Sequence, residues 1–318
     1  MKRSLAFAMA AVVLLAAGAL QAQPAQPVKV IVPFSAGGGT DNITRIVTDA
    51  LGRELDQSVI VENRAGGNTV IGALATTSAK PDGSTLLSTL DMTTTILPAV
   101  YSKLPFDPQK DLTPVAIVAK VPSLFVANPK LPANTLKELV EYSKKNPDRL
   151  NYGSATLYGQ VQGQQLKTVS GLSYQYVPFK GAPEAIQAVL GGHVDFIMVD
   201  IASAMGYLKD GRLKALTMLS AKRHPQLPDV STVVEQGWPE LEMNLWIGLF
   251  APSQTPAPVV DHLNKAVNKV VSTASVQEKL RALGHEAEPA SVERIRQMIS
   301  ADTAKWSKAA RDGNIRLD

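Results

Sequence analysis

The sequence predicts an α/β protein with two similar lobes, each a mostly parallel sheet flanked by helices. Short apolar stretches of strand length alternate with amphipathic stretches of helical length, the order that produces parallel sheets covered by helices on both faces. The alternation runs in two successive series along the chain, with no shorter repeat. The length of 318 residues suits two domains, and a hydrophobic content of 45% is enough for two cores.

The first series begins with a strand over 28–33, followed by the glycine loop 34–39 and a helix that starts near Thr40 or Asp41. Asp41 and Arg45 lie four residues apart on this helix, where an ordinary surface ion pair is expected. Apolar side chains recur at helical spacing and predict one buried face: Ile43, Ile46, Val47, Ala50 and Leu51. Further strands are expected over 59–62, 85–89, 114–121 and 123–127, with a second helix over 69–79.

The second series has the same character. Its expected strands cover 150–153, 174–178, 195–199 and 213–219, and its helices cover 136–145, 160–169, 182–190 and 202–209. A last strand over 246–251 precedes three helices over 258–272, 276–283 and 291–312. In open α/β sheets ligands bind outside the carboxyl ends of the strands, so two such sheets predict a cleft where those ends face each other.

The N-terminus predicts export. Lys2 and Arg3 precede an uncharged apolar stretch over 5–20, and the small residues Ala-Leu-Gln-Ala follow. This pattern is typical of a secretory signal peptide, here residues 1–22 with cleavage after Ala22. The alternative is a membrane anchor, but an apolar stretch of about 16 residues is short for a span. We therefore expect a periplasmic protein.

The composition excludes several functional classes. The chain has no cysteine, which removes disulfides, thiol catalysis and thiolate metal sites together. Without Lys2 and Arg3 the remaining basic residues nearly balance the 28 acidic ones, and no basic stripe with interleaved aromatic residues occurs. Aromatic residues make up only 5%, few for a surface that stacks sugars or single-stranded nucleic acid. We expect no nucleic-acid partner.

Two glycine loops, 34–39 and 65–68, each lie between a strand and a helix start. Glycines in this position leave backbone N–H groups uncovered, and the helix start adds partial positive charge, so the loop can bind an anion without a cationic side chain. A tight turn that only joins strand to helix is the alternative. Neither loop has a Gly-Lys-Ser/Thr ending or Gly-x-Gly-x-x-Gly, so nucleotide binding is not expected. Two such loops on neighbouring strands can converge on one carboxylate.

The second lobe has polar residues after three of its strands. Ser154, Thr156 and Tyr158 follow one strand. Ser154 and Thr156 could donate hydroxyl hydrogen bonds to a ligand, and a buried tyrosine could pack on it, although capping of the next helix explains Ser154 and Thr156 equally well. Lys180 follows another strand, where a solvated loop charge is the alternative. Asp200 closes a third strand and could be only a helix N-cap.

Catalytic and metal-binding constellations are not found. No Gly-x-Ser-x-Gly nucleophile elbow occurs. The histidines lie far apart along the chain without metal-ligand spacing: His193, His224, His262 and His285. His193 is expected to be exposed in a turn. We therefore expect that the protein is not an enzyme and that it binds no metal or cofactor. An exported hydrolase is a disfavoured alternative, because these histidines offer no nucleophile–base pair.

Several motifs follow one another along the chain. They are Val-Pro-Phe-Ser-Ala-Gly-Gly-Gly-Thr-Asp (32–41), Val-Glu-Asn-Arg-Ala-Gly-Gly-Asn (61–68), Lys-Pro-Asp-Gly (80–83), Asn-Tyr-Gly-Ser (151–154), Val-Pro-Phe-Lys-Gly-Ala-Pro-Glu-Ala (177–185), Gly-Gly-His-Val-Asp (191–195), Leu-Pro-Asp-Val-Ser-Thr (227–232) and Trp-Ile-Gly-Leu-Phe-Ala-Pro (246–252). The ordered set strongly resembles the tripartite tricarboxylate transporter substrate-binding family, the Bug-type receptors, and covers essentially the whole mature chain.

The resemblance implies a two-lobed periplasmic binding protein of the type 2 class (a Venus flytrap), with crossovers near 121–125 and 240–246. Lobe 1 would comprise 23–123 and 242–318, and lobe 2 would comprise 124–241. Family members hold a carboxylate through backbone amides and bridging waters of the first lobe, and the second lobe discriminates the rest of the ligand. Carried over, the ligand contacts would be Phe34, Ser35, Ala36, Gly37, Gly38, Gly67 and Asn68 in lobe 1, and Ser154, Thr156, Tyr158, Lys180, Gly181 and Asp200 in lobe 2.

The resemblance also implies a monomeric receptor that captures a small carboxylate and delivers it to membrane permease subunits. The alternative is a sensor that presents its ligand to a membrane histidine kinase. The sequence departs from the family at 155–160, where a more glycine- and serine-rich stretch and a histidine are usual. Leu157 and Tyr158 stand there instead and suggest a larger or more apolar ligand, such as an aromatic carboxylate. Asp200 leaves an amino acid possible, since it could hold an ammonium group.

Overall fold

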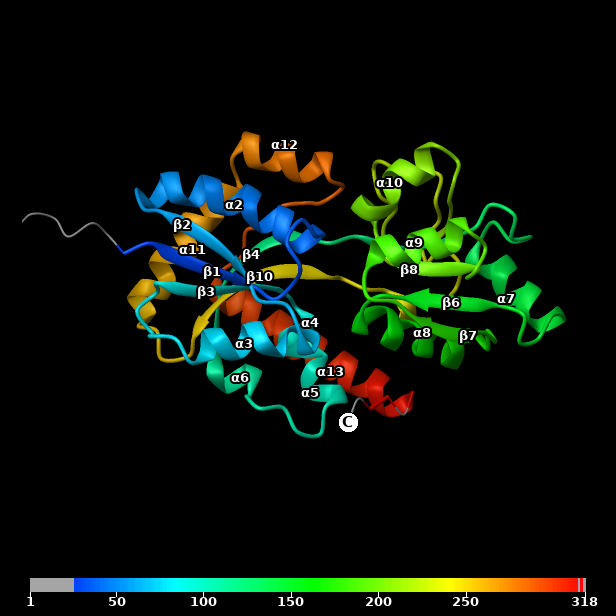
Figure 1. Cartoon of the computed structure of the whole chain (residues 1–318), viewed down its shortest axis with the longest axis horizontal. Coiled ribbons are helices and arrows are strands. Elements are labelled where there is room, and N and C mark those ends of the chain that lie inside the picture. Colours follow the sequence, from blue (N-terminus) through cyan, green and yellow to red (C-terminus); the bar gives the residue numbers. More distant parts are fainter. Residues whose placement is uncertain (1–25, 314, 317–318) are drawn as a thin grey trace, which may run out of the picture.

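The computed structural model describes residues 26–313 and 315–316, and the predicted signal peptide lies outside them. The described chain forms two five-stranded sheets side by side, each with helices packed on it (Figure 1). Sheet A has the order β2-β1-β3-β10-β4 and sheet B the order β7-β6-β8-β5-β9. The strands are β1 (Val28–Val32), β2 (Val59–Asn63), β3 (Thr85–Leu90), β4 (Leu112–Lys120), β5 (Ser123–Ala127), β6 (Asn151–Ser154), β7 (Gln175–Pro178), β8 (Phe196–Asp200), β9 (Lys214–Met218) and β10 (Trp246–Pro252).

We call sheet A with its helices lobe 1, and sheet B with its helices lobe 2. The helices of lobe 1 are α2 (Gly39–Leu55), α3 (Val70–Thr77), α4 (Met92–Thr95), α5 (Leu97–Val100), α6 (Pro108–Asp111), α11 (Ala257–Val271), α12 (Ala274–Ala282) and α13 (Val292–Asp312). Those of lobe 2 are α7 (Leu136–Lys145), α8 (Leu157–Ser170), α9 (Ala182–Leu190) and α10 (Ile201–Lys209). Short 3₁₀ turns cover Gly67–Thr69 and Pro239–Leu241.

The strand directions make the two sheets meet end to end. β1, β2 and β3 are parallel, and β10 is antiparallel to both β3 and β4, so β4 ends at the same edge of sheet A as β1–β3. The chain then enters β5, which is antiparallel to β8 with Ser123 opposite Asp200. β5 therefore starts at the edge where the parallel strands β6, β7 and β8 end. We call these two edges, each formed by carboxyl ends of parallel strands, the facing edges.

Two crossovers join the lobes. The first is the short link between β4 and β5, and the second is the longer segment between β9 and β10. They lie side by side, because the Val121 N–H donates to the Leu245 carbonyl at 2.8 Å. The second crossover is also held by lobe 2, since the Gln162 side-chain amide of α8 donates to the Leu241 carbonyl at 2.7 Å.

The core follows from strand alternation, which sends successive side chains to opposite faces of a sheet. In β1, Val30 packs on the side of α2 and α11, whereas Ile31 packs on the side of α3 and the start of α13. The first of these clusters continues into lobe 2, where it includes Phe125 and Tyr152. The α13 helix passes from α4 and α5 to α8, and the Trp306 ring lies 5.9 Å from the Tyr158 ring between centroids (Figure 1). The lobes therefore share one continuous apolar core.

The structure differs from the expected elements in two places. The α8 helix starts at Leu157 rather than near 160, because the Thr156 hydroxyl accepts a hydrogen bond from the Gly159 N–H at 3.1 Å and so caps the helix. The stretch between β3 and β4, for which no element was expected, contains the short helices α4, α5 and α6. They are too short to show helical periodicity. No helix in the described ranges is long and apolar enough to span a membrane.

Candidate ligand site

Five helices begin at the facing edges, each after the carboxyl end of a parallel strand. They are α2 and α3 in lobe 1, which follow β1 and β2, and α8, α9 and α10 in lobe 2, which follow β6, β7 and β8. In general, a helix start carries N–H groups without partners inside the helix and partial positive charge. The topology therefore directs the N-termini of five helices toward the boundary between the lobes, where an anion is favoured.

The first glycine loop is held by the carboxylate of Asp41, which lies in the first turn of α2. The Gly37 N–H donates to Asp41 Oδ2 at 2.8 Å, and the Gly38 N–H donates to the Ser35 carbonyl at 3.2 Å. These two amides are thus already used. Ser35, Ala36 and Gly37 are exposed on the surface, and no partner among the described residues is recorded for the Ser35 and Ala36 amides. The part of this loop that is available to bind an anion is therefore smaller than the whole of 34–39.

Asp41 is the centre of the network that shapes this loop. Its carboxylate also accepts hydrogen bonds from Asn63 Nδ2 at 2.9 Å and from Arg45 Nε at 3.0 Å. Asn63 Nδ2 reaches the Phe34 carbonyl at 3.1 Å as well. The expected Asp41–Arg45 ion pair is present, but Asp41 is only 1% exposed and is not an ordinary surface residue. Sequence reasoning missed Asn63, although a polar residue at the end of a strand beside a glycine loop is a usable signal.

Replacing Asp41 with asparagine is expected to lower the free energy of unfolding by about 1–3 kcal/mol at neutral pH, because buried hydrogen bonds to a charged acceptor are lost. Burial opposes ionisation, but the bonds from Arg45, Gly37 and Asn63 outweigh it and lower the pKa of Asp41 below 3.8. The contribution is therefore present above about pH 3.8 and is lost as the pH falls through the lowered pKa. Urea denaturation measures the loss. Asp49→Asn, on an exposed position of the same helix, should change stability by less than about 0.5 kcal/mol; equal effects of the two substitutions would contradict the assignment.

The second glycine loop has an unusual backbone. Gly66, Gly67, Asn68 and Thr69 all have positive φ, with Thr69 at +81°. A β-branched residue rarely adopts this conformation, so the surroundings must hold it. The Thr69 hydroxyl lies 2.8 Å from the Thr93 hydroxyl, and Asn68 Nδ2 donates to the Tyr101 hydroxyl at 2.8 Å. The exposed peptide groups of 66–68 are thus presented by a rigid support.

In lobe 2, the hydroxyls of Ser154 and Thr156 are engaged locally. The Ser154 hydroxyl donates to the Thr156 carbonyl at 3.0 Å and accepts from the Thr156 N–H at 3.2 Å. Ser154 is buried, whereas Thr156 is exposed at the start of α8, where its hydroxyl caps the helix. Helix capping therefore accounts for Thr156, which remains on the surface where a ligand could meet it, whereas the Ser154 hydroxyl holds the backbone of Thr156.

Lys180 and Asp200 lie at the starts of the two following helices. The Lys180 side chain is exposed, and its backbone N–H donates to Glu184 Oε2 at 3.0 Å ahead of Gly181, the N-cap of α9. The Asp200 carboxylate caps α10 by accepting from the Ser203 N–H at 2.9 Å and from the Ser203 hydroxyl at 2.7 Å. The alternative that Asp200 acts as a helix N-cap is confirmed, and contact with a ligand stays a prediction.

The expectation of a larger or more apolar ligand depended on Leu157 and Tyr158. Both are buried, and Tyr158 is only 1% exposed, because α8 turns its first residues toward Trp306 of α13. The Tyr158 ring is part of the contact between the lobes and is not available to a ligand in this arrangement. Leu157 and Tyr158 therefore give no support for a larger or more apolar ligand.

The histidines are distributed differently from what their separation in the sequence indicates. His193 is exposed, as expected. His224 and His285, which are distant in the sequence, are brought close enough for their rings to interact, and both are largely buried. No cluster of three or more metal-ligating side chains occurs within the described ranges.

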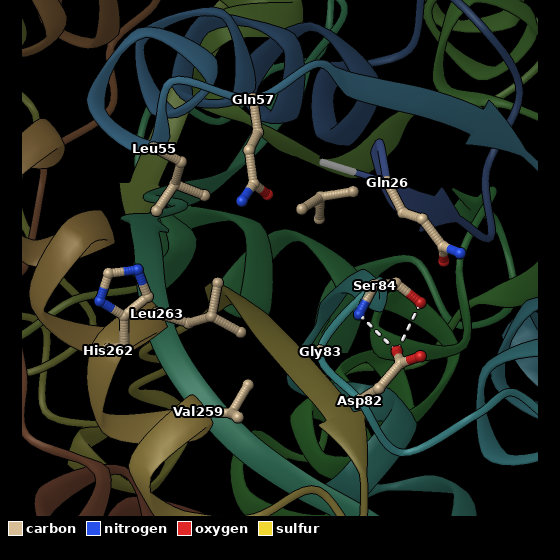
Figure 2. A pocket seen from close by; sticks show the side chains of 10 residues that line it. Gln26, Leu55, Gln57, Asp82, Gly83, Ser84, Val259, His262 and Leu263 are labelled. Atoms are coloured by element: carbon tan, nitrogen blue, oxygen red, sulfur yellow. Dashed lines mark hydrogen bonds between the residues drawn. The ribbon is translucent and has the colours of Figure 1, made fainter. Parts of the chain in front are cut away.

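Two cavities of lobe 1 lie at the edge of sheet A opposite its facing edge. One, of about 290 Å³, opens at the amino ends of β1 and β3 and is lined by Gln57, Asp82, Ser84 and His262 among others (Figure 2). The other, of about 450 Å³, lies at the amino end of β4 beside Thr255 and Asn264. Neither lining includes a predicted ligand residue, so these cavities are separate from the facing edges.

The fold and the facing helix starts define a two-lobed solute-binding protein. The family model for the tripartite tricarboxylate transporter family receptor matches residues 43–315, and the chain belongs to that family. Protein BugT of Bordetella pertussis is 33% identical over 301 residues, with 92% of this chain and 91% of that protein covered.

Two solved structures of relatives contain carboxylates. Rpa4515 of R. palustris with adipate superposes with a TM-score of 0.85 at 29% identity, covering 92% of this chain and 99% of that one. MatC of Rhodopseudomonas palustris with bound malate superposes with a TM-score of 0.81 at 32% identity, covering 90% of this chain and 99% of that one. These matches agree with the two-lobed α/β fold expected from the sequence.

Proposed function

We propose that this receptor captures a small dicarboxylate between its lobes in the periplasm and delivers it to the membrane subunits of a tripartite tricarboxylate-type transporter. The observation that carries the proposal is the arrangement of the facing edges, at which five helices begin and the peptide groups of 35–36 and 66–68 are exposed. One carboxylate would lie against the exposed peptide groups of Ser35, Ala36, Gly67 and Asn68. The other end of the ligand would meet Thr156 and Lys180 in lobe 2. Adipate and malate in the two relatives support this ligand class.

A thermal-shift comparison of acids with their amides tests the ligand class. Malate or adipate should raise the melting temperature, because a ligand that binds only the folded state stabilises it by mass action. At a concentration 100 times its Kd, an acid should add about 2.7 kcal/mol. The matched diamides should produce no shift, since they lack the charge that helix N-termini attract. Equal shifts for acid and amide would refute recognition of charge.

The Lys180 side chain provides a second, internal check. Lys180→Met keeps the apolar length of the side chain but removes its charge from an exposed position. It should weaken binding of a dicarboxylate more than binding of the corresponding monocarboxylate, and Lys209→Met on the exposed end of α10 is the control. A loss that is equal for both ligands would place the second carboxylate elsewhere.

A further inference from the structure

Buried polar atoms that lack a hydrogen-bond partner gather where the lobes meet. Within the described ranges they include the side-chain amide oxygens of Gln162 and Gln165 on α8 and both ring nitrogens of His285. Native proteins seldom leave such atoms unpaired, so each requires a physical reason. His285 is the clearest case, because neither ring nitrogen has a well-formed hydrogen bond, although the Lys120 backbone lies beside the ring, and the residue is only 2% exposed.

His285 is held by lobe 1. It follows α12, which packs on α2, and the next residue is bonded to β4 through the Lys120 N–H, which donates to the Glu286 carbonyl at 2.8 Å. Gly284 ends the helix with φ of +75°, a conformation that suits glycine. The ring is therefore fixed to the end of sheet A from which the first crossover leaves.

The same segment presses against lobe 2. A Cβ atom at Gly284 would lie 2.6 Å from Cγ2 of Ile201, the first residue of α10. Gln226 Nε2, in the loop after β9, donates to the Arg281 carbonyl at 3.2 Å. The His285 ring is thus enclosed by elements of both lobes, and any rotation of one lobe on the other must change its surroundings.

The Asp200 carboxylate at the start of α10 and the His224 ring act on the His285 ring electrostatically, and the Lys120 backbone is within hydrogen-bonding reach of it. Burial lowers the pKa of His285, and the Asp200 carboxylate opposes that shift. Glu286 faces His224, and the Lys120 ammonium is paired with Glu288 at 3.1 Å. Asp200 accepts two bonds from Ser203, which leaves further lone pairs on its carboxylate.

We propose that His285 of lobe 1 is a positioning residue for Asp200 of lobe 2, and that a ring N–H bonds the Asp200 carboxylate when the lobes rotate to enclose a ligand. The inference rests on the proposed function. Gly284, which precedes His285, meets Ile201, which follows Asp200, so the ring and the acid belong to the same contact between the lobes. The bond would favour the ligand-bound arrangement and fix the Asp200 side chain at the facing edge of lobe 2.

Proton NMR titration of the histidine rings tests this bond, with the resonances assigned from His285→Gln and His224→Gln. Saturation with malate should raise the pKa of His285 by at least about half a pH unit, because a bonded carboxylate stabilises the charged ring. In Asp200→Asn, which keeps an N-cap oxygen for the Ser203 N–H, this rise should vanish and the pKa in the free protein should be lower. His193, exposed on lobe 2, should not respond.

The two ideas fail differently. A protein that binds neither malate nor adipate would overturn the proposed function and this inference with it. A protein that binds malate while the pKa of His285 stays the same, or rises equally in Asp200→Asn, would overturn only the role assigned to His285.

Discussion

The free energy of unfolding is expected to fall as the pH rises from about 4 to about 8, because the buried Asp91 carboxyl group resists ionisation. Replacing Asp91 with asparagine should remove most of this fall. Asp91 lies at the carboxyl end of β3 and is only 1% exposed. Burial raises the pKa of its carboxyl group to about 8, against 3.8 for an ordinary aspartate, despite a hydrogen bond from the Trp246 N–H at 3.1 Å. The folded protein therefore holds a proton that the unfolded chain has already released.

The sign follows from proton binding. Between about pH 4 and about pH 8 the folded state binds more protons at this site than the unfolded state, so the free energy of unfolding falls as the pH rises. One titrating group gives a slope of about 1.4 kcal/mol per pH unit. Asp91→Asn should flatten this slope and be more stable than the parent protein above about pH 8. Asparagine suits the site, because its oxygen can accept from Trp246 and its amide can donate to the nearby Tyr158 hydroxyl.

Urea denaturation at half-unit pH steps measures this effect. Asp302, on α13, also has its pKa raised by burial and should leave a residual slope of the same sign in the variant. Asp210→Asn, at an exposed position after α10, is the matched control and should leave the slope unchanged. An unaltered slope in Asp91→Asn would show that the carboxyl group is ionised in the folded protein.

Replacing Gly159 with alanine is expected to cost about 1–3 kcal/mol and to disturb the start of α8. A Cβ atom there would lie 1.9 Å from Ser154 Oγ and 2.7 Å from Ser154 Cβ. Ser154 is 1% exposed and its hydroxyl is fixed by two bonds, so it has no room to move away. The helix would have to lift from β6, and Thr156 would shift at the facing edge.

Gly206→Ala on α10 is the matched control for Gly159→Ala. No heavy atom lies within 4 Å of a Cβ built at Gly206, which is exposed within the helix. Alanine there should stabilise the protein by about 0.5–1 kcal/mol, because glycine is unfavourable in a helix interior. The two substitutions should therefore shift the melting temperature in opposite directions, and Gly159→Ala should also weaken malate binding. Shifts of the same sign would contradict the close packing of α8 on β6.

The fold could be predicted because strand and helix periodicities repeat over long stretches, whereas details of the site depend on contacts that no local pattern encodes. The glycine loops and the cap at Asp200 follow from residues adjacent in sequence. The support of Thr69 by Thr93 and the burial of Tyr158 under Trp306 join distant segments. The proximity of His224 and His285 is of the same kind and requires the sheet topology.

The paired crossovers determine which movements are open to the molecule. The Val121 N–H is bonded to the Leu245 carbonyl, so the two connecting segments are joined to each other by a backbone hydrogen bond. Sliding one segment along the other would break that hydrogen bond, whereas bending or twisting the two segments together would keep it. Because α8 holds Leu241 and the Met243 N–H donates to the Leu219 carbonyl, we expect bending in the few residues between Met243 and β10. We therefore expect the lobes to rotate about a short hinge formed by the two crossovers rather than to slide past each other. A crosslink between the crossovers would stop this rotation without altering the facing edges.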